Sequence, residues 1–60
     1  MEYAAVIYDA MNVIVRVEER PDERRARKAG EFYTKRRPGW WYTVAEGEDV
    51  IDMFKGLINA

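Results

Sequence analysis

Residues 3–17 are rich in β-branched side chains and carry two competing periodicities. Val13, Val15 and Val17 alternate with other residues, as in a half-buried strand, although a helical stripe also runs from Tyr3 to Val17. Strands are favoured because six of the twelve residues 6–17 are Val or Ile, which lose rotamer freedom in a helix. The sequence DAMN at residues 9–12 then predicts the turn of a first hairpin, without a glycine to mark it. The helical alternative remains open on sequence grounds.

Residues 20–30, RPDERRARKAG, are almost entirely polar. They contain almost nothing apolar beyond Ala26 and Ala29, and Asp22 is suited to cap a helical turn. This segment therefore predicts a charged loop or short helix between two hairpins.

Residues 31–45 predict the second hairpin. Their aromatic and threonine side chains favour strands, and Pro38 and Gly39 suit the two central positions of a type II turn. With period two, Trp40 and Trp41 face opposite sides of the sheet, so we expect one indole on an uncovered face.

Residues 47–58 predict a C-terminal amphipathic helix. Acidic residues gather at its start, where the helix dipole favours negative charge, and Gly56 suggests a close contact with another backbone. The apolar residues share one helical face: Val50, Ile51, Phe54, Leu57 and Ile58. The predicted fold is α+β: one domain over residues 1–60, with an antiparallel sheet of about four strands packed on one C-terminal helix that covers one face.

Composition argues against an enzyme. The 60 residues contain no Cys, His or Ser, so the common nucleophiles and the commonest acid–base group are missing. The acids Glu46, Glu48, Asp49 and Asp52 are explained by the helix start, and no glycine-rich phosphate loop occurs. We expect no catalytic residue, no cofactor and no metal site.

Size and hydropathy bear on assembly and location. A chain this short, without disulfides or zinc, is marginally stable, which favours a homodimer. With no leader-like segment and no apolar run of membrane length, we expect a cytoplasmic protein without a membrane partner.

The charge distribution suggests a binding surface. The net charge is −1, but residues 16–37 hold nine of the ten cations and a net charge of +4. Aromatic side chains stack on bases and cations neutralise phosphates, so a basic aromatic hairpin is suited to nucleic acid, single-stranded or duplex. The candidate binding residues are Arg24, Arg25, Arg27, Lys28, Tyr33, Lys35, Arg36, Arg37, Trp40 and Trp41.

The same residues are also consistent with a protein ligand, or with none. The protein is alternatively a self-associating regulator or inhibitor that binds a larger protein through a sheet edge and its aromatic patch. Cross-strand aromatic pairs and Arg–Trp stacking also stabilise small sheets without any ligand. The acidic overall composition counts against nucleic acid.

Two family resemblances rest on the expected order of elements. Strand, turn, strand and helix over residues 31–57 resemble the arm-type DNA-binding domains of tyrosine integrases. The helix over residues 47–58, following a strand, is similar to that of antitoxin domains of the HicB type. Each covers half of the chain or less, and neither assigns a role to any residue of this sequence.

Overall fold

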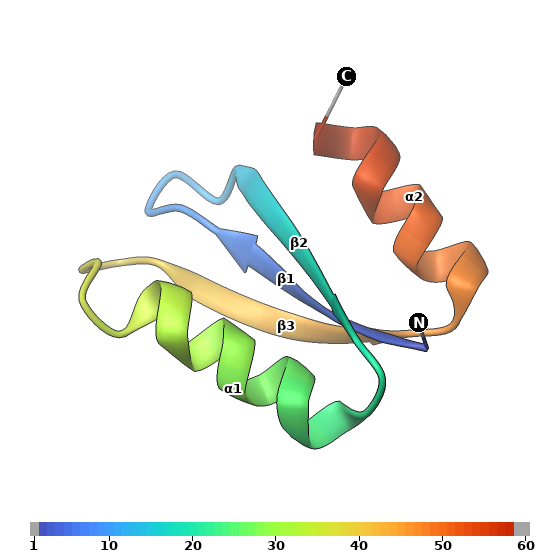
Figure 1. Ribbon diagram of the computed structural model, residues 1–60. Coiled ribbons are helices and arrows are strands. Elements are labelled where there is room, and N and C mark those ends of the chain that lie inside the picture. Colours follow the sequence, from blue (N-terminus) through green and yellow to red (C-terminus); the bar gives the residue numbers. More distant parts are fainter. Residues whose placement is uncertain (1, 59–60) are drawn as a thin grey trace.

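The protein folds as an α+β domain with one three-stranded antiparallel sheet and two helices (Figure 1). The computed structural model describes residues 2–58. The strands lie in the order β2-β1-β3, so β1 is central. The elements are β1 (Tyr3–Tyr8), β2 (Ile14–Arg20), α1 (Glu23–Thr34), β3 (Trp41–Glu46) and α2 (Glu48–Ile58).

The first hairpin is confirmed, and residues 3–17 contain strands rather than a helix. β1 pairs with β2 with an irregularity after Ile7, and the Asp9 carboxylate accepts hydrogen bonds from the backbone N–H groups of Met11 and Val13. Asn12 adopts a left-handed backbone with φ of 65°. Asn tolerates this conformation better than most residues, which explains how the turn forms without glycine.

The prediction of a second hairpin is wrong in its first half. Residues 31–34, predicted as strand, are the last turn of α1, and residues 35–40 connect α1 to β3. In the described part of the chain, the sheet consequently has three strands instead of four, and there are two helices instead of one. Asp22 caps α1 by accepting a hydrogen bond of 2.8 Å from the backbone N–H of Arg25. The predicted strand–turn–strand–helix order over residues 31–57 is absent, so the resemblance to integrase arm domains loses its basis.

The Pro38–Gly39 turn is confirmed as type II, although it joins a helix to a strand. The backbone N–H of Trp40 donates to the carbonyl of Arg37 at 3.0 Å, and Gly39 has φ of 83°. A positive φ at this position is the signature of the type II turn and explains the glycine.

Each face of the sheet carries a helix, whereas the sequence predicted one covered face. From β1, Ala5 and Ile7 pack toward Ala29 of α1, while Ala4 and Val6 pack toward Ile51 of α2. The buried apolar core is small, because five of its eight residues are alanine: Ala4, Ala5, Val6, Ile7, Ala26, Ala29, Ala45 and Ile51. Small side chains let both helices approach the central strand closely, but they bury little apolar area.

α2 covers its face only in part. Ile51 is buried and Phe54 half-buried, but Val50, Leu57 and Ile58, predicted on the same covered face, remain exposed. The close contact expected at Gly56 is also absent within residues 2–58, where a Cβ would meet open space. Within the same residues, neither helix is long and apolar enough to cross a membrane.

Gly30 fixes the distance between α1 and β3. It is buried in α1, and a Cβ at this position would overlap the Tyr42 ring of β3. The glycine is therefore a packing requirement inside the helix rather than a break between elements.

We predict opposite effects for the same substitution at the two helical glycines. Gly30→Ala should lower the free energy of unfolding by about 1–3 kcal/mol, because the methyl group overlaps a packed ring. Gly56→Ala, the matched control, should raise it by about 0.5–1 kcal/mol, because alanine is the better helix former and has room. Urea denaturation followed by circular dichroism measures both. A Gly30→Ala protein as stable as the parent would contradict the close α1–β3 packing.

Candidate nucleic-acid interface

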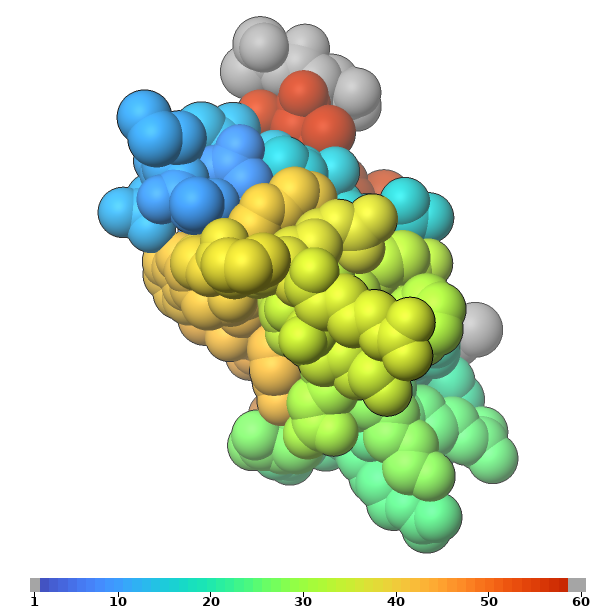
Figure 2. Space-filling model, turned by 90° about the vertical axis from the view of Figure 1, so that its left-hand side faces the viewer, coloured from blue at the N-terminus to red at the C-terminus, as the bar shows by residue number. Residues whose placement is uncertain are grey.

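The cations of residues 24–37 lie on one helix and the connection that follows it, not on a hairpin. α1 ends at Thr34, and the backbone N–H of Lys35 still donates to the Glu31 carbonyl at 3.0 Å. Lys35, Arg36 and Arg37 are exposed in the connection to β3. This connection lies beside the β1–β2 turn at one end of the molecule (yellow and blue in Figure 2), where Gly39 approaches Ala10 closely.

α1, together with Arg20 of β2 and the connection after the helix, borders two adjoining open hollows, of about 350 and 430 Å³. Both are lined by Phe32 and Tyr33, which join them into one surface. Arg25, Lys28 and Phe32 are three and four residues apart, so they follow one stripe of the helix. We call this the basic surface; its residues are Arg20, Arg25, Lys28, Phe32, Tyr33, Lys35, Arg36 and Arg37.

Two predicted site residues of α1 lie outside this surface. Arg24 and Arg27 border a neighbouring hollow together with Glu23, Lys28 and Glu31. Arg27 donates to Glu23 at 2.6 Å, and this hydrogen bond raises the pKa of the Arg27 guanidinium above its ordinary value. Arg27 is thus paired within α1, as Arg25 is with Asp22, and an anionic ligand has to compete with Glu23 for its guanidinium.

Ion pairing separates the cations into two groups. Within residues 2–58, five form ion pairs: Arg16, Arg20, Arg25, Arg27 and Lys55. The other five form no ion pair with any residue of this described range: Arg24, Lys28, Lys35, Arg36 and Arg37. Four of these five belong to the basic surface, which therefore carries positive charge that the protein itself does not neutralise.

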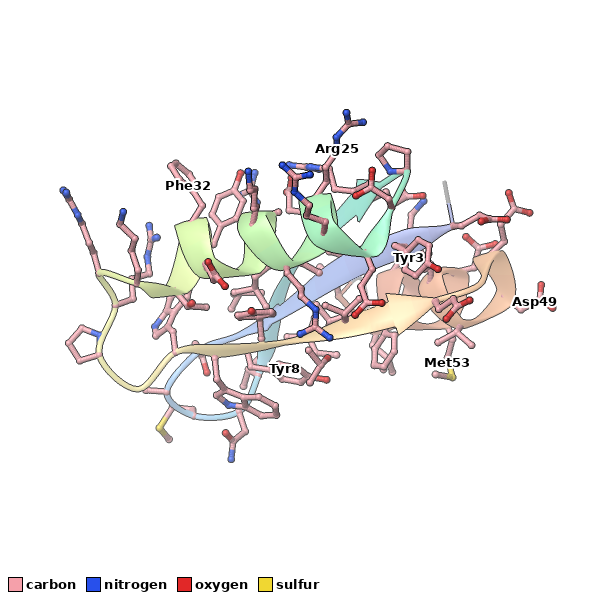
Figure 3. All side chains as sticks on the ribbon, turned by 90° about the horizontal axis from the view of Figure 1, so that it is seen from below. Tyr3, Tyr8, Arg25, Phe32, Asp49 and Met53 are labelled. Carbon is pink, nitrogen blue, oxygen red and sulfur yellow. The ribbon has the colours of Figure 1, made fainter. Side chains whose placement is uncertain are left out.

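Phe32 is the aromatic side chain most available to a ligand. It is 70% exposed and lies edge-on to the Tyr33 ring, with centroids 5.1 Å apart. Figure 3 shows Phe32 and Arg25 projecting from the side of α1 away from the sheet. Tyr33 is half-buried and carries the Arg16 guanidinium over its ring at 4.3 Å. The Phe32 side chain therefore buries little apolar surface in the core.

The two tryptophans do not form one patch. Trp40 packs with the α1-facing core, and the Arg37 guanidinium lies 4.8 Å from its ring centre. Trp41 lies on the α2-facing side, stacked on Tyr8 with centroids 4.0 Å apart, and its Nε1 donates to Asn12 Oδ1 at 2.9 Å. Trp41 is 41% exposed but lies on the opposite face of the sheet from Trp40, and Trp40 is the tryptophan that contacts the unpaired Arg37.

The sequence prediction missed Arg20 and Phe32 as members of the surface. The signal for Phe32 is visible only once residues 23–34 are helical, because the 25, 28, 32 spacing has no meaning on a strand. Arg20 lies at the end of β2 and joins the surface only through the tertiary structure. Acidic residues line a different hollow at the start of α2: Glu2, Glu46, Glu48 and Asp49. Within residues 2–58, no three acidic side chains converge closely enough to hold a metal ion.

In comparisons with protein-family models, curated proteins and solved structures, none matched this chain.

Proposed function

We propose that the protein binds nucleic acid, preferentially single-stranded, through the basic surface. The observation that carries the proposal is the cluster of unpaired cations around an exposed phenylalanine. Lys28, Lys35 and Arg36 neutralise phosphates, and Phe32 stacks on an unpaired base. The negative net charge of the chain opposes this binding only weakly, because several acidic side chains line the hollow at the start of α2, away from the basic surface.

A single strand fits the arrangement better than a duplex. Stacking on Phe32 requires an exposed base face, which a duplex offers only after unpairing. The cations follow one side of a helix and the connection after it, as a track for a flexible backbone. The function is binding without catalysis.

A protein partner at the sheet edge is a second hypothesis. Within residues 2–58, β2 and β3 each have one edge without a neighbouring strand, which another chain is able to extend. The separation of Trp40 and Trp41 onto opposite faces removes the single aromatic patch that such a partner would contact.

We predict that Lys28→Ala weakens oligonucleotide binding and reduces its salt dependence. The affinity for a labelled oligothymidylate should fall about three- to tenfold, and the slope of log K against log salt should decrease by about 1, as for one lost phosphate contact. Lys55→Ala, the same substitution on α2, should leave both values unchanged. Fluorescence anisotropy over a salt series measures them. Binding that is absent at low salt, or indifferent to salt, would contradict the proposal.

Phe32→Ala should weaken binding differently. Loss of one stacking contact should lower the affinity about fivefold to a hundredfold without altering the salt slope, because no charge is removed. Met11→Ala, at a position 81% exposed in the β1–β2 turn, is the control. Equal affinities of the Phe32→Ala and Met11→Ala proteins would assign Phe32 no part in binding.

A further inference from the structure

The outward side of α2 is unusually apolar for a solvent-exposed helix. Val50, Met53 and Leu57 are 40%, 56% and 54% exposed. Their spacing of three and four residues places them on one stripe, separate from the buried Ile51. We call Val50, Met53 and Leu57 the α2 stripe.

The small core makes burial of this stripe important for stability. The largest fully buried side chains are Ile7, Ile51 and Val6, and most of the remaining core is alanine. Domains of this size without disulfides or metal commonly obtain the missing apolar burial by self-association. A second copy is the partner that offers an equal apolar stripe at equal concentration.

We infer that the protein forms a two-fold symmetric homodimer in which the α2 stripes of two copies pack antiparallel. Met53 lies next to the midpoint between positions 50 and 57. When two α2 helices pack antiparallel around this midpoint, Val50 of each copy lies against Leu57 of the other. A two-fold axis then passes close to Met53. Such an interface is closed and self-complementary.

The charges of α2 favour the antiparallel orientation. Its first turn contains Glu48 and Asp49, which line one hollow together with Glu2 and Glu46, whereas its last turn contains Lys55. A parallel pair brings the two acidic ends together. An antiparallel pair places the two acidic ends at opposite ends of the interface, where they do not repel each other.

The interface extends from α2 onto the sheet. A stable interface buries about 800 Å² on each partner, roughly a fifth of the 4241 Å² exposed by the chain, and a helix of 11 residues is too short to supply this alone. Figure 3 shows Met53 and Tyr8 projecting on the same side of the molecule, opposite Arg25 and Phe32. Tyr8 and the stacked, half-exposed Trp41 supply the adjoining surface. The basic surface of each copy remains on the outside of the dimer.

The first test is the molar mass in solution, without nucleic acid. Light scattering over about a hundredfold range of concentration should give twice the 7.1 kDa of the chain, and the melting temperature should rise with concentration. Met53→Glu should raise the dissociation constant at least about a hundredfold, because it places two like charges at the axis. Met11→Glu, equally charged but in the β1–β2 turn, should remain dimeric.

Three results of this test would overturn the inference. They are a parent protein that is monomeric throughout, a higher oligomer, or equal dissociation by Met53→Glu and Met11→Glu. Circular dichroism checks that each variant is folded. We expect both variants to fold, because the substituted side chains are exposed.

The second test determines the orientation and does not depend on a charged variant. The chain has no cysteine, so a single introduced thiol cross-links only where it meets its own copy. Met53→Cys should form a disulfide-linked dimer on mild oxidation, and Val50→Cys should not. The double variant with Val50→Cys and Leu57→Cys should cross-link, because position 50 of one copy meets position 57 of the other. Cross-linking by Val50→Cys alone would indicate parallel helices, and absence of cross-linking by all three proteins would refute the pairing.

Discussion

Complete burial of the central strand between two helices is the constraint on which the rest of the structure depends. Ala4 to Ile7 of β1 have no exposed surface, and alternate residues face alternate helices. Because a strand has period two, four consecutive apolar residues require cover on both faces. The N-terminal strand therefore needs a helix on each side, and α2 provides only one of them.

The other helix, α1, is formed by the most charged part of the chain. α1 meets this need with a narrow inner face of Ala26, Ala29 and Gly30, which allows the Tyr42 ring to lie directly against the helix backbone. Burial of that face stabilises the helix, so the remaining positions are free to be charged. The basic surface is thus a consequence of how little of α1 the core requires.

Because the two helices lie on opposite faces of the sheet, the proposed nucleic-acid surface is also separated from the proposed dimer interface. The unpaired cations lie on the α1 side, and the exposed apolar side chains of α2 lie on the other. The proposed assembly through α2 would leave the basic surface open, and such a dimer would present it twice. Two linked surfaces bind a long strand more tightly than either alone, through the raised effective concentration of the second contact.

Local signals in the sequence determined several elements correctly. The β-branched residues of 3–17 determined a hairpin, Pro38 and Gly39 a type II turn, and the apolar period of residues 47–58 a helix, because each depends on neighbours within a few positions. The segregation of charge into residues 16–37 is likewise a property of the sequence alone. Only the tertiary structure decided that residues 31–34 are helical and that Phe32, rather than Trp41, accompanies the cations. The buried face of α1 consists of alanine and glycine, which contribute little to hydropathy, and the Tyr42 ring that makes this face favourable reaches it only when β3 pairs with β1.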